Sequence, residues 1–283
     1  MKKTYLRKEH IMFLAIILII CALCAGLIGV GLNVKSVAGA EETTASVWDG
    51  ASSDTSWYND EGSEFTVTTA AQFAGFASLV NSGKQFIDQT VYLANDIDLN
   101  NVDWASTNFI IYGTFKGVLD GQGHTISNLK VEGFLRPGLF TANFHGTARN
   151  IVFKNANLSG DQSAGVFAYD ITSDTALIEN VTIDSCTVVS NGDNAGGIVG
   201  WTDCTIKNCL VKNSTITSSA ANAGGITGAG QVYKGAGLIY NCGSIGNTIT
   251  AATGNYAGKI IGKGESGGAA EACYSDGAAV GYN

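Results

Sequence analysis

The residues best suited to chemistry are four aspartates, and the chemistry they suggest is that of carbohydrate-active enzymes. Asp96 and Asp98 alternate along a short apolar stretch, which predicts that both carboxylates project from the same face of a strand. We expect Asp103 and Asp120 to lie a coil away from them. A polysaccharide lyase needs clustered carboxylates for calcium beside a basic residue, and a glycoside hydrolase needs two carboxylates at a defined separation. Asp96 and Asp98 are thus the best candidate Ca²⁺ site.

Two features of the sequence argue against catalysis by this cluster. Beyond residue 40 the only arginines are Arg136 and Arg149. The stretch DGQG from Asp120 is typical of a turn between strands. We therefore favour turn and cap roles for these aspartates, and we predict no catalytic residue, no metal site and no cofactor. A lyase or hydrolase remains the alternative.

The N-terminus has the order of a secretory signal. Basic residues precede an apolar run over residues 11–32, and Ala38, Gly39 and Ala40 supply a small-residue cleavage site. The run is long enough to span a bilayer if it stays uncut, and then it is the one membrane contact. We predict that residues 1–40 are a signal peptide or an uncleaved anchor, and either outcome places the rest of the chain outside the membrane.

The net charge and the cysteine content limit the classes of partner and of metal or disulfide site that we expect. Removal of residues 1–40 changes the net charge from −8 to about −12, which argues against nucleic acid or an anionic membrane surface as a partner. Five cysteines remain, an odd number without a C-x-x-C pair, so a zinc ribbon or a full disulfide framework is not expected.

The second half of the chain repeats itself. One asparagine recurs at spacings of 30, 28 and 33 residues, and a motif of small residues and glycine follows each time: AGVFA, AGGIVG, AGGITG and AGKIIG. Short alternating apolar runs lie between these anchors. Repeats of this length predict a solenoid, and we predict a right-handed parallel β-helix in which each unit is one coil.

Stacked coils assign roles to the recurring residues. The asparagines should form a buried ladder in which each side-chain amide bonds to its counterpart one coil along; they are Asn150, Asn180, Asn208 and Asn241. A polar binding row is the alternative for them. Val181, Cys209, Cys242 and Cys273 share the next position, so these cysteines are predicted to be small buried hydrophobic residues.

Upstream of the repeats the pattern changes. A capping box at Thr69 precedes apolar residues at helical spacing, which predicts a short amphipathic helix that covers the open end of the solenoid. We divide the remaining chain into residues 41–64, an acidic leader that is loosely attached or part of the cap, residues 65–99, the N-terminal cap, and residues 100–283, the β-helix.

A variable corner is the predicted binding surface. After each glycine motif an aromatic residue occurs with a polar partner: Tyr169 with Asp170, Trp201 with Asp203, and Tyr233 with Lys234. Aromatic rings at coil spacing would stack against successive sugar rings, and insertions on one side of a solenoid often mark its binding face. The alternative is that these rings only cover the neighbouring coil.

The strings TTAAQFAGFASLVNSG, VYLANDIDL and FKGVLDGQGHTISNLKV, together with the AGGIVG-type motifs, resemble the GLUG-motif β-helix proteins of bacteria. The resemblance implies a pectate-lyase-like β-helix on secreted or surface proteins, including the non-catalytic regions of IgA-cleaving metallopeptidases. The peptidase activity is not carried over, because the chain has no H-E-x-x-H motif and beyond residue 40 its only histidines are His124 and His145.

Three functions follow as hypotheses. The first is an extracellular, non-catalytic surface or adhesion protein whose partner is a glycan or a host or bacterial surface protein. The second is a carbohydrate-active enzyme on the same scaffold. The third is a structural fragment, or the N-terminal part of a larger surface protein, that associates end to end through residues 267–283.

Overall fold

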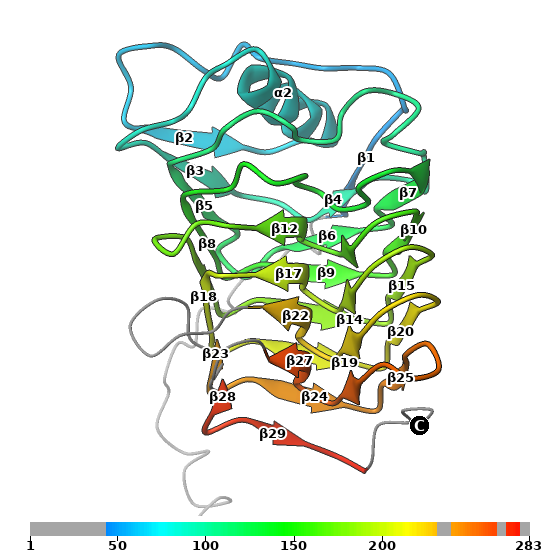
Figure 1. The fold of residues 1–283 in the computed structure, drawn as a ribbon. Helices are drawn as coiled ribbons and strands as arrows, with labels where there is room; N and C mark the ends of the chain where they lie inside the picture. The colour runs from blue at the N-terminus through cyan, green and yellow to red at the C-terminus, as the bar shows by residue number, and fades with distance from the viewer. Residues whose placement is uncertain (1–43, 231–238, 265–269, 278–283) are drawn as a thin grey trace, which may run out of the picture. The chain divides into compact units, whose positions relative to one another are not determined.

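The computed structural model describes residues 44–230, 239–264 and 270–277, and these residues form a parallel β-solenoid of about seven turns. Every strand pairing in it is parallel, and each strand lies beside its counterpart from the next coil (Figure 1). The predicted all-β parallel β-helix is confirmed. The predicted signal or anchor segment, residues 1–40, lies outside the described residues. Within the described residues, no helix is long and apolar enough to cross a membrane.

Five parallel sheets run along the stack, and the strands of one coil belong to the first to the fifth sheet in chain order. The first sheet contains β2 (Glu64–Val67), β3 (Thr90–Leu93), β5 (Val118–Asp120), β8 (Thr147–Arg149), β13 (Leu177–Glu179), β18 (Thr205–Lys207), β23 (Ile239–Tyr240) and β28 (Ala270–Glu271). The second contains β1 (Ser46–Val47), β4 (Ile97–Asp98), β6 (Thr125–Ser127), β9 (Val152–Lys154), β14 (Thr182–Asp184), β19 (Leu210–Lys212), β24 (Gly243–Ile245) and β29 (Tyr274–Ser275).

The other three sheets complete each coil. The third contains β7 (Lys130–Phe134), β10 (Asn157–Gly160), β15 (Thr187–Ser190), β20 (Thr215–Ser218) and β25 (Thr248–Thr250). The fourth contains β11 (Ala164–Gly165), β16 (Ala195–Gly196), β21 (Ala223–Gly224) and β26 (Ala257–Gly258). The fifth contains β12 (Ala168–Ile171), β17 (Val199–Thr202), β22 (Thr227–Gly230) and β27 (Ile261–Gly264).

The turn between the first and second sheets is an asparagine turn. Its recurring residue has positive φ, from 50° to 58°, in Asn150, Asn180, Asn208 and Asn241. Asparagine adopts this left-handed conformation more readily than most residues, which explains why the sequence repeats it. A second left-handed turn, which the sequence did not predict, joins the second and third sheets; it contains Asn128, Asn155, Ser185, Asn213 and Gly246.

The corner between the fourth and fifth sheets is a glycine corner. A Cβ atom on Gly196 would lie 1.9 Å from the carbonyl oxygen of Val199, and one on Gly224 would lie 1.9 Å from that of Thr227. Real Cβ atoms do not approach backbone this closely, so the glycines of the repeated motif are required by the close approach of the chain.

The interior is a continuous apolar column. Phenylalanine rings fill its upper coils, where Phe140 lies 5.0 Å from Phe144 and 5.1 Å from Phe167 between ring centroids. Smaller residues such as Ile178 and Ile206 continue it, fully buried. Cys209 and Cys242 are buried as predicted and Cys273 is half-buried; all five cysteines of the described region are free thiols.

Helix α2 (Ala70–Asn81) covers the upper end of this column, at the level of β2 in Figure 1. Thr69 is its N-cap, and the Thr69 side chain accepts a hydrogen bond from the backbone N–H of Gln72. Phe73 and Phe76 are fully buried beneath it. The helix predicted at Thr69 is thus present and lies over the apolar end of the coils.

Residues 44–64 are packed onto the solenoid instead of being loosely attached. β1 pairs with β4, so this segment supplies the first strand of the second sheet. Trp48 is 1% exposed and its ring lies 5.4 Å from that of Trp104. Burial of so large an apolar ring outweighs the polar composition of the segment. The described part of the predicted leader is therefore part of the cap.

Candidate functional site

The predicted row of aromatic residues is not in register. The glycine motifs fix the pairing, with Ala164 opposite Ala195 and Ala168 opposite Val199. Trp201 lies one residue farther from its motif than Tyr169 does from its own, so the partner of Trp201 is Asp170. An in-register parallel pair cannot bring Tyr169 and Trp201 to the same position. The next coil has Ala229 opposite Trp201.

Tyr169 is engaged by local packing. The Arg136 guanidinium lies over its ring, 5.3 Å from the centroid. Burial, with a further contribution from the charge of Asp170, raises the pKa of Tyr169 to about 12. For Tyr169 this corresponds to the alternative interpretation, in which the ring covers its neighbours.

Asp170 and Trp201 line one pocket of about 390 Å³, which we call the corner pocket. Its other lining residues are Ser163, Thr172, Asp193 and Asn194. The Oδ1 atom of Asp170 is buried and has no hydrogen-bond partner. A buried carboxylate oxygen without a donor is costly, so this carboxyl is incompletely satisfied by the protein.

The electrostatics of the corner pocket centre on the same carboxyl group. Burial raises the pKa of Asp170 to about 7, and the charge of Asp193 also raises it. The hydroxyl groups of Tyr169 and Ser163 and the charge of Arg136 act in the opposite direction. The carboxyl of Asp170 therefore changes its charge near neutral pH.

The other residues predicted for the corner are not found among the described residues that line the corner pocket. Asp203 lies beyond Trp201 on the chain, where its backbone N–H donates to the carbonyl of Ile171 at 2.8 Å, and it is not one of the lining residues. Tyr233 and Lys234 lie outside the described residues. Sequence reasoning missed Ser163 and Asn194; both directly precede the first alanine of a glycine motif, and that shared position was a signal that could have found them.

The four asparagines do stack, but as two pairs. Asn180 Nδ2 donates to Asn150 Oδ1 at 2.9 Å, and Asn241 Nδ2 donates to Asn208 Oδ1 at 2.8 Å. Between the pairs, Asn208 Nδ2 instead donates to Glu179 Oε1 at 3.4 Å. Asn150 is half-buried and the other three are exposed, so the expectation of a buried ladder is wrong. Exposure follows from the left-handed turn, which projects the side chains outward from the coil.

The aspartates considered first for catalysis are engaged in turns. Asp96 Oδ1 accepts from the backbone N–H of Thr125 at 2.9 Å, and Asp98 Oδ1 accepts from Asn128 Nδ2 at 2.7 Å. Asp120 belongs to the first sheet and is bound to Arg149 at 2.8 Å, whereas Asp98 belongs to the second. Among the described residues, no group of three or more His, Cys, Asp or Glu side chains is arranged to hold a metal ion.

The family follows from the comparison with known proteins. Residues 36–185, more than half of the chain, match the model of the M26 IgA1-specific metallo-endopeptidase N-terminal region. The chain belongs to this family. By its description, the matched part of the M26 family is an N-terminal region of a peptidase.

Individual relatives cover only part of the chain. It is 32% identical over 158 residues to halomucin of Haloquadratum walsbyi, an alignment that covers 52% of this chain and 2% of halomucin. It is 31% identical over 132 residues to the immunoglobulin A1 protease of Streptococcus sanguinis, covering 45% of this chain and 7% of that protein. The matches thus span a small fraction of either relative.

A solved structure shares the fold of this M26 family member. A crystal structure described as that of a candidate immunoglobulin A1 protease from Bacteroides ovatus matches with a TM-score of 0.55 and 21% identity. The match covers 79% of this chain and 78% of that one. At this identity the likeness concerns the fold alone.

Proposed function

We propose that this chain is an extracellular, non-catalytic β-helix module that binds a glycan, free or on a surface glycoprotein, in the corner pocket. Two features support an extracellular location: the apolar run over residues 11–32 followed by a small-residue cleavage site, and membership of the M26 N-terminal-region family. The acidic net charge of −8 disfavours nucleic acid as the ligand.

The observation that carries the proposal is that Trp201 lines one pocket together with the carboxyl-bearing residues Asp170 and Asp193. A sugar ring has an apolar face of C–H groups and an edge of hydroxyl groups. An indole binds the first and a carboxylate accepts from the second. Asn194 adds an amide to the same pocket, so the lining offers each kind of contact that a sugar needs.

The test is a glycan and mucin array probed with the full chain and with Trp201→Ala. We expect the substitution to remove binding and to leave the circular dichroism spectrum unchanged. Tyr112→Ala is the matched control, because Tyr112 is an aromatic residue that is 57% exposed and does not line the corner pocket. Binding that survives Trp201→Ala unaltered would rule out the corner pocket as the site.

One observation favours a second candidate, glycoside hydrolysis. Asp170 and Asp193 line the same pocket, and the pKa of Asp170 is raised to about 7, as a general acid requires. In this case the wild type would release reducing sugar from the glycan that it binds, and Asp193→Asn would stop the release while retaining the binding. Binding without any release of reducing sugar by the wild type would exclude it.

A further inference from the structure

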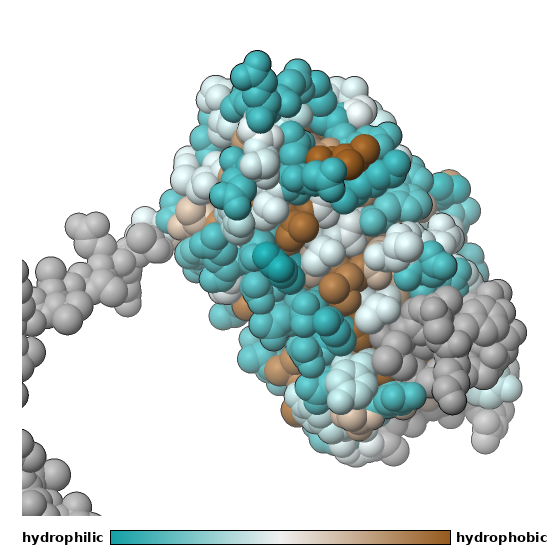
Figure 2. Space-filling view, turned by 90° about the vertical axis from the view of Figure 1, so that its left-hand side faces the viewer, coloured by the Kyte–Doolittle hydropathy of each residue, from teal (hydrophilic) through white to brown (hydrophobic). Residues whose placement is uncertain are grey.

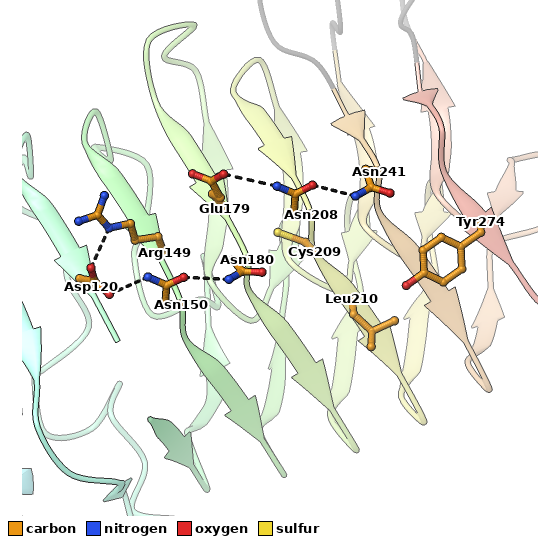
Figure 3. A pocket seen from close by; sticks show the side chains of 10 residues that line it. All are labelled: Asp120, Arg149, Asn150, Glu179, Asn180, Asn208, Cys209, Leu210, Asn241 and Tyr274. Atoms are coloured by element: carbon orange, nitrogen blue, oxygen red, sulfur yellow. Dashed lines mark hydrogen bonds and ion pairs between the residues drawn. The ribbon is translucent and has the colours of Figure 1, made fainter. Parts of the chain in front are cut away.

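A second hollow runs along the asparagine turn, on the other side of the first sheet from the glycine corner. It has a volume of about 710 Å³, and its lining includes all four asparagines of the turn, together with Leu210 and Tyr274 (Figure 3). We call it the asparagine groove. A smaller hollow of about 460 Å³ continues it toward the cap and adds Val152 and Thr182. The groove therefore extends across several coils.

One wall of the groove repeats every two coils. Asp120 binds the Arg149 guanidinium at 2.8 Å and accepts from Asn150 Nδ2 at 3.0 Å. Two coils later Glu179 does the same with Lys207, at 3.1 Å, and with Asn208. Each acid thus holds the cation and the asparagine of the next coil. With coils about 4.8 Å apart, this polar unit repeats at about 9.6 Å.

The repeat leaves one acceptor uncommitted in each unit. Within the part of the chain that the structure describes, no group donates to Asn180 Oδ1 or to Asn241 Oδ1, the last amide of each pair. Figure 3 shows the offset between the two pairs, with Asn150 and Asn180 in one line and Asn208 and Asn241 in another. The two open acceptors therefore lie two coils apart along the groove.

The opposite wall is apolar. Leu210, Gly243 and Tyr274 occupy one register position of β19, β24 and β29. The Tyr274 ring lies over Gly243, where an added Cβ would meet its Cζ at 2.3 Å, and Tyr274 is 49% exposed. Val152 and Thr182 continue the same position toward the cap. An extended polymer bound in the groove would thus contact amide groups on one side and apolar groups on the other.

The charge of the groove wall limits the kind of polymer that can bind there. The carboxylates of Asp120 and Glu179 are both matched by cations, so this wall carries no unpaired charge. The face of the first sheet beside the groove is mostly hydrophilic with scattered hydrophobic spots, as Figure 2 shows. A net charge of −8 repels a polyanion, and the paired cations offer it no free site. A neutral polyhydroxylated chain fits this wall.

We propose that the asparagine groove binds a neutral, extended β-linked glycan, with one disaccharide for each two coils. Two sugar rings end to end have about the length of the two-coil repeat, about 9.6 Å. One hydroxyl or acetamido N–H per disaccharide donates to Asn180 Oδ1 or Asn241 Oδ1. The apolar ring faces lie against Leu210 and Tyr274. The groove is a site separate from the corner pocket, which shares none of its lining residues.

The test uses the full chain carrying Trp201→Ala, so that the corner pocket is removed, and calorimetric titration with cello- and chito-oligosaccharides of two to six units. We expect affinity to increase with length up to the hexamer. Asn180→Gly should weaken binding of the hexamer by about threefold to tenfold, the equivalent of one hydrogen bond. Glycine keeps the left-handed turn, so the amide is lost without backbone strain.

Asn155→Gly is the matched control, because Asn155 also has positive φ, 54°, but lies in the other left-handed turn. It should bind the hexamer as its parent does. The groove proposal is overturned if the hexamers do not bind, if Asn180→Gly binds as tightly as its parent, or if Asn155→Gly weakens binding equally. Hexamer binding that depends on Asn180 would support the groove even where Trp201→Ala has no effect on the array and the corner proposal fails.

Discussion

The glycine corner and the asparagine turn bend the chain at fixed places in every coil, but by opposite means. At the glycine corner the backbone itself fills the space, so that a Cβ on Gly196 would lie 1.9 Å from a carbonyl oxygen. At the asparagine turn the side chain is present and bonds to its neighbour, as Asn180 does to Asn150 at 2.9 Å. The first turn is fixed by the absence of a side chain and the second by hydrogen bonds between side chains.

This difference determines how completely the polar side chains of each region are hydrogen-bonded. The glycine corner is tightly packed, and beside it the Asp170 carboxylate is buried with an oxygen that has no partner. The asparagine turn is exposed, and its side chains are nearly all paired. We therefore expect substitutions at the corner to have large effects on folding and pH dependence, and substitutions at the turn to have small effects.

The largest effect is expected from Gly196→Ala. The new methyl group would overlap the Val199 carbonyl, and the surrounding backbone has no room to move, so we expect a loss of more than about 4 kcal/mol in the free energy of unfolding. Urea denaturation measures it. Gly123→Ala is the control: its φ is +88° but no atom lies within 4 Å of the added Cβ, so only the conformational cost of about 1–2 kcal/mol applies. Equal losses in the two variants would contradict this description of the corner.

The next effect is the pH dependence of Asp170→Asn. Because burial raises the pKa of Asp170 from 3.8 to about 7, the neutral carboxyl is the form that the folded protein favours. The wild type should lose stability as the pH rises through this range, and asparagine, which does not ionise, should not. The variant should then exceed the wild type by about 2–4 kcal/mol at pH 8 and by little at pH 4 in denaturation curves. A constant difference across this range would show that ionisation of Asp170 is not the cause.

A smaller effect is expected at the asparagine turn. Asn208 gives one hydrogen bond to Glu179 and receives one from Asn241, so Asn208→Gly should cost about 1–2 kcal/mol. Asn208→Ala should cost about 1 kcal/mol more, since alanine must adopt a φ of 56°. Thermal melting of both variants provides the measurement. If alanine and glycine are equally tolerated, the left-handed conformation is not what selects asparagine here.

The smallest effect belongs to the ion pairs of the same wall. Lys207 and Glu179 have side chains that are 36% and 30% exposed, and exposed pairs of this kind are weak. Glu179→Gln should change the free energy of unfolding by about 0.5 kcal/mol or less, and added salt should remove the difference. If Glu179→Gln lowers the free energy of unfolding by more than Asn208→Gly does, the ion pairs stabilise the turn more than the amide hydrogen bonds do.

The sequence predicted what repeats in type and spacing. The recurring asparagine and the glycine motif located the coils, and Thr69 located the capping helix. The second left-handed turn was missed because its position is filled by different residues, among them Ser185 and Gly246. Composition alone does not identify a conformation that several residue types adopt.

Other features depend on choices that only the packed structure settles. The register of Trp201 against Asp170 is set by a one-residue difference in distance from the glycine motif. The ladder breaks because Asn208 donates to the Glu179 carboxylate, an acceptor that carries a charge, instead of to the amide of Asn180. Asp193 lies two residues before the first alanine of its glycine motif, where the neighbouring coils have Gln162 and Ala221, so the repeat gives its position but not its charge.

The most direct test of the proposed site is the pKa of the Asp170 carboxyl group. Carbon-13 NMR measures it in the free protein and again in the protein saturated with the glycan that binds best on the array. In the free protein the pKa should be about 7. A sugar hydroxyl that donates to the Asp170 carboxylate stabilises the ionised form, so glycan binding should lower the pKa. An Asp170 pKa that the bound glycan leaves unchanged would contradict the account.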